Sequence, residues 1–310
     1  MTESVQSRAP KPGRMGVGVI GAGRVGPVLG SALRAAGHSI VGINAGSDDS
    51  RQRAQAMLPG VPLLSAQQVV ERCEVVLLAV PDDAIADLVA GLAATTGWQL
   101  GQIVVHVSGA HALDILEPAT KQGAIGLAIH PAMTFTGTSI DIGRMVGTSF
   151  AVTAPAPFLP IAQAMVVEMG GEPVVVDPRA RVAYHAALTH AANHAVTLVS
   201  QATEVLRAAG IENPGTLLSH LVHASVEGAL RYASDGADPM LAVTGPAVRA
   251  DVGTLAGHVD VMRASEHTDL ADAYLTMARS TALRAFRAGR LSERGLMAVL
   301  DVLGSTPSES

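Results

Sequence analysis

The chain has 310 residues, of which 48% are hydrophobic and 15% charged, and its formal net charge is −6. This length and apolar content predict about two domains with sizeable cores. The composition argues against nucleic-acid and membrane partners, because there is no long basic run and no uncharged apolar run near the roughly 20 residues of a membrane span.

The first half of the chain alternates short apolar runs with amphipathic stretches. Residues 1–13 are polar and are predicted to be a disordered tail. Predicted strands cover residues 15–20, 39–43, 61–64, 75–80, 103–107, 126–130, 149–152 and 173–176, and predicted helices cover 24–36, 47–57, 84–94 and 157–169. This alternation indicates an α/β domain, residues 14–178, with a doubly wound parallel sheet covered by helices on both faces.

From residue 179 onward the pattern is helical only. Helices are predicted over residues 179–209, 215–234, 246–263, 266–288 and 292–303, several with start or stop signals such as Pro246 and Gly289. The sequence therefore predicts an all-α C-terminal domain over residues 179–304, followed by a short disordered tail at 305–310.

A glycine-rich loop, GAGRVG at residues 21–26, joins the first predicted strand to the first predicted helix. Gly21 permits a tight turn, Gly23 lets the backbone approach a pyrophosphate, and Gly26 lets the helix pack on the strand. Backbone N–H groups around Arg24 and Val25, together with the helix dipole, can hold phosphates. The loop predicts a Rossmann dinucleotide-binding unit, although a Gly-rich turn without a ligand is the alternative.

The end of the second predicted strand bears on the choice of dinucleotide. NAD-binding domains usually place a carboxylate there, whereas this strand ends at the neutral Asn44, with Ser47, Arg51 and Arg53 following. These residues favour NADP over NAD, since arginines tolerate a 2′-phosphate. The carboxylates at positions 48 and 49 argue the other way, and the arginines could be ordinary solvated helix charges.

Three later strand ends should face the same ligand crevice, because parallel strands present their carboxyl ends at one edge of the sheet. Val80 and Pro81 are expected near the nicotinamide ribose, and Ser108 and His130 near the substrate. The alternative for Ser108 is an ordinary turn serine.

The predicted helix after residue 178 carries the candidate catalytic residues. This helix is apolar nearly all round and should be buried. His185, Thr189 and Asn193 share one of its faces at i, i+4 and i+8, whereas His194 falls on the other side. His185 could donate the proton that accompanies hydride transfer, and Asn193 could hold the substrate oxygen or the nicotinamide amide. A satisfied core histidine is the alternative.

One further arginine could bind a substrate acid. Arg249 could clamp a carboxylate and Asp251 could orient it, although an exposed salt bridge is the competing interpretation. The remaining histidines form no metal-binding signature, so no metal is expected. The single cysteine, Cys73, excludes an internal disulfide and fits a cytoplasmic location.

Several motifs together resemble one group of bacterial proteins: the glycine loop, VPDD at 80–83, VSGA at 107–110, IHP at 129–131, YHAA at 184–187 with Asn193, and TGPxxRxD at 244–251. The group consists of Rossmann-like proteins with a helical C-terminal domain, related to pyrroline-5-carboxylate reductase, ketopantoate reductase and 6-phosphogluconate dehydrogenase-like families. The resemblance implies an NADP-type Rossmann domain, a helical domain that dimerises, and a substrate site between the two.

The chain departs from its better-known relatives at one position. Ketopantoate reductases and β-hydroxyacid dehydrogenases carry a catalytic lysine on the first helix of the second domain. The only lysines here are Lys11 and Lys121, outside that helix, and His185 stands where the lysine is expected. A lysine mechanism therefore does not carry over.

The sequence supports two hypotheses of different classes. The first is an NADP-dependent oxidoreductase that transfers hydride to a small carbonyl or imine acid, with ketopantoate reductase-like or pyrroline-5-carboxylate reductase-like activity as narrower versions. The second is a non-catalytic NADP(H) sensor or interaction protein, which the missing lysine favours. A homodimer through the helical domain is expected in either case.

Overall fold

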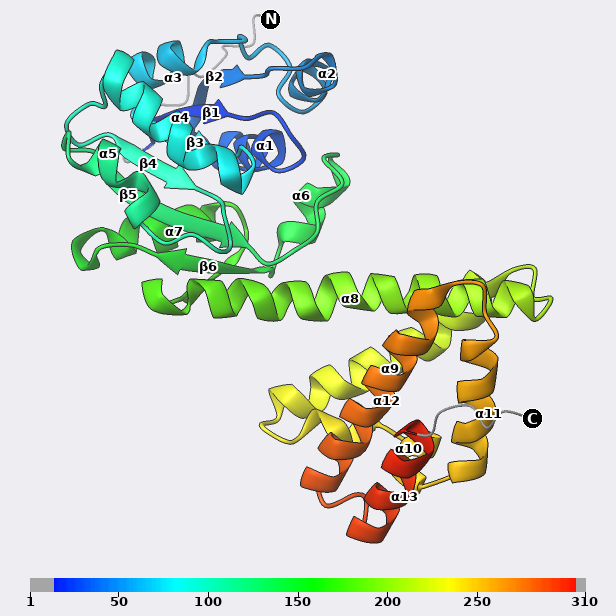
Figure 1. The fold of residues 1–310 in the computed structure, drawn as a ribbon. Helices are drawn as coiled ribbons and strands as arrows, with labels where there is room; N and C mark the ends of the chain where they lie inside the picture. The colour runs from blue at the N-terminus through cyan, green and yellow to red at the C-terminus, as the bar shows by residue number, and fades with distance from the viewer. Residues whose placement is uncertain (1–13, 305–310) are drawn as a thin grey trace, which may run out of the picture. The chain divides into compact units, whose positions relative to one another are not determined.

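The computed structural model describes residues 14–304, and the predicted tails at 1–13 and 305–310 lie outside the described residues. The N-terminal half forms a seven-stranded sheet with the order β2-β1-β3-β4-β5-β6-β7 (Figure 1). The strands are β1 (Gly16–Ile20), β2 (Ser39–Asn44), β3 (Val75–Leu78), β4 (Ile103–His106), β5 (Ile125–Pro131), β6 (Ser149–Thr153) and β7 (Glu172–Val175). The predicted doubly wound sheet is confirmed.

Helices cover both faces of this sheet because successive side chains of each strand point to opposite sides. In β3, Val75 and Leu77 join one core, whereas Val76 and Leu78 join the other. The helices and 3-10 turns of this half are α1 (Gly26–Ala36), α2 (Asp48–Met57), α3 (Ala66–Arg72), α4 (Asp82–Thr95), η1 (Asp114–Leu116), α5 (Glu117–Thr120), α6 (Ile140–Met145), η2 (Ala156–Phe158), α7 (Leu159–Glu168) and η3 (Pro178–Ala180).

Two strand expectations are corrected. The sheet is not wholly parallel, since β6 runs antiparallel to β5, with Pro131 opposite Phe150. Residues 61–64 do not form a strand but a single bridge between Ile43 and Leu63. Apolar patterning encodes burial and not strand direction, so the sequence could not show that the connection after β5 returns at the same edge of the sheet.

That connection is held by a buried carboxylate. The Asp141 side chain is fully buried and accepts hydrogen bonds from the backbone N–H groups of Thr136 and Gly137, both at 2.8 Å. Burial alone would raise the pKa of this carboxyl, but the donated hydrogen bonds hold the pKa below its usual range. The carboxylate thus stabilises a loop whose Gly137 lies against Arg24 of the glycine loop.

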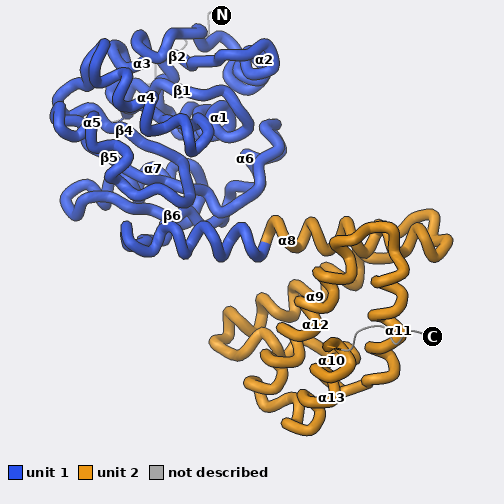
Figure 2. The backbone as a smooth tube through the Cα atoms, viewed as in Figure 1, with its two compact units in different colours: residues 1–191 blue, residues 192–310 orange. Residues whose placement is uncertain are grey.

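The C-terminal half is helical, as expected. It comprises α8 (Arg181–Ala208), α9 (Pro214–Ser234), η4 (Pro239–Ala242), α10 (Pro246–Arg249), α11 (Val252–Arg263), α12 (Thr268–Arg287) and α13 (Glu293–Gly304). The chain divides into two compact units at residues 191/192, within α8 (Figure 2). The predicted domain border at 178 lies just before this helix. Helices α10 to α13 supply a core of small and branched residues, including Val248, Leu255, Ala282 and Val299.

The predicted helix over residues 246–263 is interrupted. Ala250 adopts the left-handed conformation with φ 57°, so α10 ends there and α11 begins at Val252. Arg249 spans the break, donating from Nε and Nη2 to one oxygen of Asp251 at 2.9 and 2.6 Å. Local side-chain pairing therefore accompanies a break that the apolar periodicity did not reveal.

The expectation that the helix after residue 178 is buried is wrong for the single chain. Arg181 is the only buried residue of α8, and Pro214 is the only one of α9. The reason is that the core of the helical unit is built from α10 to α13, which leaves apolar side chains of α8 and α9 exposed. None of the described helices is long and apolar enough to cross a bilayer.

Candidate functional site

The glycine loop lies between β1 and α1, at the point where the chain order in the sheet reverses. β1 pairs with β2 on one side and β3 on the other, which creates the crevice where open α/β sheets bind ligands. Gly21 has φ +104°, and a Cβ there would collide with the carbonyl oxygen of Ala79. A Cβ on Gly26 would collide with the carbonyl oxygen of Gly21, whereas a Cβ on Gly23 would meet nothing within 4 Å.

This geometry fits a pyrophosphate. Gly23 leaves open space beside the backbone, so a ligand can approach closely there. Val25 precedes α1 without any side-chain hydrogen bond capping the helix, so that side chain satisfies none of the N–H groups of the first turn. Such N–H groups and the positive end of the helix dipole favour a bound anion.

The residues after β2 have different partners. The Asn44 amide donates to the carbonyl of Leu64 at 2.9 Å, and Ser47 caps α2. Arg51 is exposed and pairs with Asp48 at 2.7 Å. Arg53 instead donates to the carbonyl of Ala22 in the glycine loop at 3.4 Å.

Arg53 also borders a pocket of about 530 Å³ formed by α2 and residues 137–139. Of the two arginines after β2, it is therefore Arg53 that reaches the glycine loop, where an anion can bind.

At the same edge of the sheet, a serine two positions after the end of β4 forms a buried network. The Ser108 hydroxyl donates to Asp82 Oδ2 at 2.6 Å and accepts from the backbone N–H groups of Ala110 and His111, both at 3.2 Å. The side chain is buried, and its hydrogen-bonding groups are engaged by neighbouring residues. Ser108 therefore shapes this edge of the sheet through Asp82 and its own turn.

A fully buried guanidinium ties α8 to the same network. Arg181 donates from Nη2 to the carbonyl of Ser108 at 2.6 Å and from Nη1 to the hydroxyl of Thr153 at 3.0 Å. Burial lowers the pKa of Arg181, and the nearby Tyr184 and Asp82 oppose this effect. Since a guanidinium in a protein keeps its proton, Arg181 places a positive charge behind the carboxyl edge of the sheet.

Three aromatic side chains, His130, Tyr184 and His185, lie close to one another near Arg181. His130, at the end of β5, lies with its Nδ1 2.9 Å from the hydroxyl of Tyr184 on α8. The rings of His130 and His185 meet edge to face at 5.6 Å between centroids. Gly109 packs between them, and a Cβ on that residue would collide with His185 Nδ1. We call His130, Tyr184 and His185 the aromatic cluster.

Two members of the cluster, His130 and Tyr184, are neutral near pH 7. Burial lowers the pKa of His130 to about 4, with further lowering by His185 and Arg181 and a smaller opposing effect of Asp82. Burial also raises the pKa of the Tyr184 hydroxyl, against the effect of Arg181. Both groups can therefore take part in neutral hydrogen bonds, and the phenol keeps its proton until a base accepts it.

The structure brings some of the predicted site residues together. Gly21, Val80 and Pro81 lie at the ends of neighbouring strands, and His130 contacts the helix that carries His185. Thr189 lies one turn further along α8 and is half-buried, whereas Asn193 is exposed. Arg249 and Asp251 lie in the second compact unit, paired with each other.

Sequence reasoning missed three residues of this region. Asp82 belongs to the VPDD run and could have been selected from its place after a buried strand. Tyr184 precedes the chosen His185 by one residue. Arg181 gave no signal, because a basic residue at a helix start has no special pattern; only the fold shows that it is buried.

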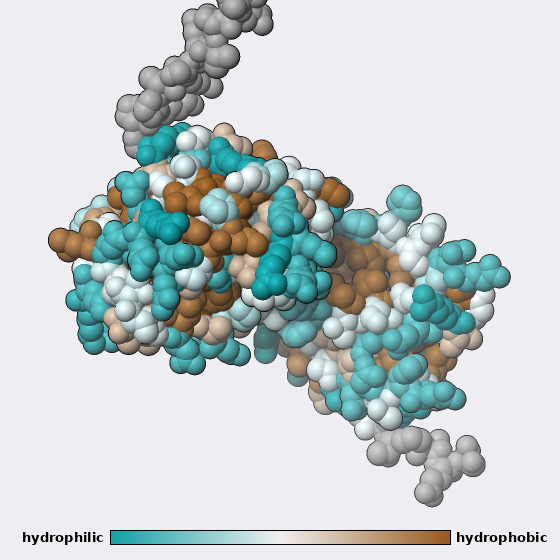
Figure 3. All heavy atoms as spheres, turned by 90° about the horizontal axis from the view of Figure 1, so that it is seen from above, coloured by the Kyte–Doolittle hydropathy of each residue, from teal (hydrophilic) through white to brown (hydrophobic). Residues whose placement is uncertain are grey.

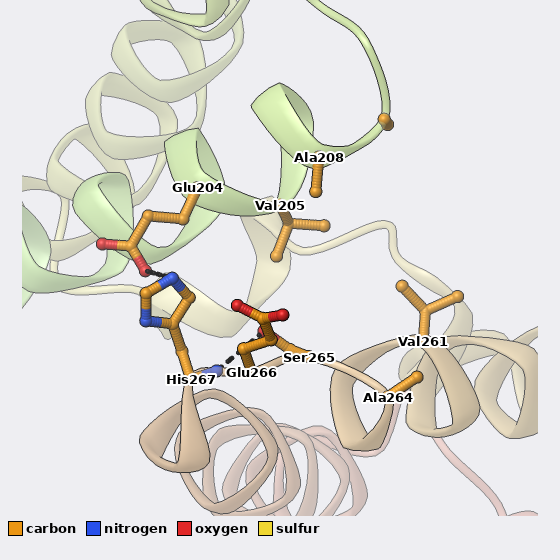
Figure 4. Close-up of a pocket in the computed structure, with 9 residues that line it drawn as sticks. Glu204, Val205, Ala208, Val261, Ala264, Ser265, Glu266 and His267 are labelled. Atoms are coloured by element: carbon orange, nitrogen blue, oxygen red, sulfur yellow. Dashed lines mark hydrogen bonds and ion pairs between the residues drawn. The ribbon is translucent and has the colours of Figure 1, made fainter.

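A separate pocket of about 530 Å³ lies in the helical unit (Figure 4). His267 and Glu204 face each other across it at 3.7 Å, and the remaining wall is largely apolar, including Val205, Ala208 and Val261. Among the described residues, no group of three or more His, Cys, Asp and Glu side chains could hold a metal ion.

Family comparisons agree with the two-part architecture. Residues 1–131 match the Rossmann-like domain family, and residues 148–281 match a family described as a domain of unknown function, DUF2520. The chain carries a Rossmann-like domain followed by a DUF2520 domain. A search of curated proteins gave no significant match.

Solved structures share this fold at low sequence identity. A protein provisionally assigned as an NADP oxidoreductase, from Bacteroides fragilis, aligns with a TM-score of 0.73 and 19% identity over 87% of this chain and 98% of its own. An imine reductase from Myxococcus stipitatus in complex with NADP+ aligns with 0.64 and 18% over 92% and 98%. A reductive aminase from Aspergillus terreus in complex with NADPH and ethyl levulinate aligns with 0.63 and 14% over 89% and 95%.

Two glycine substitutions should separate the packing of the loop from its openness. Gly26→Ala should lower the melting temperature by several degrees, because its Cβ collides with the Gly21 carbonyl oxygen and the helix must shift. Gly23→Ala should leave the melting temperature within about one degree, since its Cβ meets open space. Calorimetry of both variants tests this, and equal melting temperatures would contradict it.

Proposed function

We propose that this chain is an NADP-dependent oxidoreductase that transfers hydride to a small carbonyl or imine acid. One observation carries the proposal: the glycine loop after β1 and the aromatic cluster at the end of β5 lie at the same carboxyl edge of the sheet. Loop and cluster belong to the same compact unit. A reduction needs one hydride and one proton. The glycine loop can bind the cofactor that supplies the hydride, and the aromatic cluster has neutral groups that can donate the proton.

Gly21, Gly23 and Gly26 would hold the pyrophosphate, with backbone N–H groups near Arg24 and Val25 donating to it. Bound NADPH supplies the hydride. The cluster supplies the proton and shields the reacting group from bulk water, with His185 as the member that the sequence nominates. Thr189 and Asn193 continue the same helix and would position the substrate.

Similar structures support this choice of cofactor and chemistry. The reductases from Myxococcus stipitatus and Aspergillus terreus were solved with NADP+ and NADPH, and a variant of the former with NAD+. For this chain, Arg53 beside the glycine loop favours the 2′-phosphate of NADP. Arg249 could hold a substrate carboxylate only by giving up its bond to Asp251.

The reaction is tested with NADPH and a panel of small keto acids and cyclic imines. The wild type should oxidise NADPH with at least one compound. His185→Ala should lower turnover about tenfold or more while NADPH affinity stays within twofold, because the cluster acts on the substrate. Gly23→Ala should weaken NADPH binding despite normal stability, since its methyl group fills the space for the pyrophosphate.

His258→Ala is the matched control, because His258 lies in the helical unit and pairs with Tyr274. NADPH binding without oxidation by any compound would favour the alternative, a non-catalytic sensor. Full turnover in His185→Ala would remove that residue from the proposal.

The cofactor preference is tested on the two arginines after β2. Arg53→Ala should weaken NADPH binding about tenfold and change NADH binding little, because the charge-assisted hydrogen bond that Arg53 would donate to the 2′-phosphate is lost. Arg51→Ala should leave both affinities within twofold, since Arg51 already pairs with Asp48 on the exposed side. Fluorescence titrations measure both, and wild-type affinity for NADH equal to that for NADPH would contradict the preference.

We also propose a homodimer through the helical unit. Exposed apolar side chains gather on α8 and α9: Val182, Val196, Leu198, Val199, Leu217, Leu221, Val226 and Leu230. A groove of about 300 Å³ runs between these helices, and Figure 3 shows hydrophobic surface gathered on the helical unit. Apolar faces of this extent mark interaction surfaces, and self-association is the commonest solution.

Leu221→Glu places a charge in this groove and should convert a dimer into a monomer of 31.6 kDa. Leu100→Glu is the control, because Leu100 is 89% exposed and lies in the other unit. Light scattering after size exclusion measures the masses. A monomeric wild type, or an unchanged mass for Leu221→Glu, would contradict the proposed dimer.

A further inference from the structure

We propose that the proton donor is the Tyr184 hydroxyl, and that His130 is the positioning residue that holds the phenolic oxygen through its Nδ1–H group. This inference rests on the proposed function and names the group in the aromatic cluster that loses its proton. His130 at the end of β5 and Tyr184 on α8 are 54 residues apart in the chain.

His130 and α8 fix the position of the Tyr184 hydroxyl. The Tyr184 oxygen lies 2.9 Å from His130 Nδ1, and the two rings meet edge to face at 5.7 Å. The His130 ring is held against α8 by this bond and by the edge-to-face contact with His185. The phenol is therefore fixed on the side of α8 that faces the carboxyl edge of the sheet, where the glycine loop also lies.

The proton on the neutral His130 ring decides which way the Tyr184 hydroxyl can point. A neutral imidazole carries one proton, on either Nδ1 or Nε2. If Nδ1 carries it, His130 donates to the tyrosine oxygen and the phenolic hydrogen is free to point at a substrate. The groups that act on His130 are Arg181 and His185 of α8 and Asp82 of α4. Burial is the largest cause that lowers the pKa of His130 to about 4, His185 and Arg181 lower it further, and Asp82 opposes them.

The buried charge of Arg181 stabilises the form of Tyr184 that has lost its proton. A phenol that donates its proton becomes an anion, which is costly next to apolar residues. The Arg181 guanidinium stabilises that anion, as shown by its lowering effect on the pKa of Tyr184. The Nδ1–H group of His130 adds a hydrogen bond that strengthens as the charge develops. His185 is less suited to this role, because its buried Nδ1 faces Gly109 without a hydrogen-bond partner among the described residues.

Tyr184 gives up one proton for each hydride that the substrate receives. The hydride that bound NADPH would supply adds to the carbon of a C=N or C=O group and leaves NADP+. The Tyr184 O–H bond breaks as a new N–H or O–H bond forms on the substrate. Tyr184 is left as a phenolate, which takes up one proton from the solvent before the next cycle, so each turnover consumes one hydride and one proton. Neither His130 nor Arg181 changes its protonation state.

The first test needs no activity. The chain has three tyrosines, so ultraviolet titration of the phenolates can be resolved by comparing the wild type with Tyr184→Phe. In His130→Ala the Tyr184 titration should move to a pH about one unit higher, because the donor to the phenolate is lost. His130→Asn should restore the wild-type midpoint, since an asparagine amide can place an N–H group at the Nδ1 position.

His130→Gln is the matched variant, because its longer side chain places the amide at the Nε2 position instead. It should behave like His130→Ala. His258→Ala is the second control: its Nδ1 lies 2.8 Å from the Tyr274 hydroxyl, so it should move only the titration of Tyr274. An unmoved Tyr184 titration in His130→Ala overturns the role of His130.

The second test measures reduction by NADPH of 1-pyrroline-2-carboxylate, a small cyclic imine acid. Tyr184→Phe should lower kcat at least a hundredfold with NADPH affinity unchanged, and His130→Asn should retain more turnover than His130→Gln. Turnover of Tyr184→Phe within threefold of the wild type overturns the inference while the proposed function stands. A wild type that binds no NADPH overturns the proposed function, and the titrations then still decide the pairing of His130 with Tyr184.

Discussion

The buried guanidinium of Arg181 ties the first turn of α8 to the sheet. Its bonds to the Ser108 carbonyl and the Thr153 hydroxyl join the ends of β4 and β6 to the first turn of the helix. Thr153 in turn donates to the carbonyl of Val176, which secures the chain just before that turn. Tyr184 lies three positions after Arg181, on nearly the same face of the helix, so its side chain also points to the sheet and meets His130.

The same arrangement concentrates electrostatic effects at one edge of the sheet. A positive charge without direct contact to water lies behind a phenol and an imidazole that are both held neutral. Asp82 lies nearby, but its carboxylate accepts from Ser108 at 2.6 Å. Low-dielectric surroundings strengthen each of these interactions, so an anion that forms at this edge gains more from Arg181 than it would in water.

The described part of the second compact unit is held together by apolar helix packing and not by a buried charge. Its core consists of α10 to α13 with small side chains such as Ala278, Ala282 and Ala285, which allow close helix packing. Apolar residues of α8 and α9 remain outside this core. A helix that is apolar nearly all round can bury its surface within its own chain or against another chain, and its sequence reads the same in both cases.

The sequence by itself determined the sheet, most of its helices and the glycine loop, because these follow from local periodicity and from glycines that a tight turn requires. Only the tertiary structure decided which polar side chains meet. Strand direction at β6, the burial of Arg181, and the pairing of His130 with Tyr184 depend on contacts between segments far apart in the chain. Residue spacing within one helix was enough to select His185. Tyr184 became a candidate only in the tertiary structure, where His130 at the end of β5 lies against it. An apolar pattern indicates that a side chain is buried, but not which residue buries it.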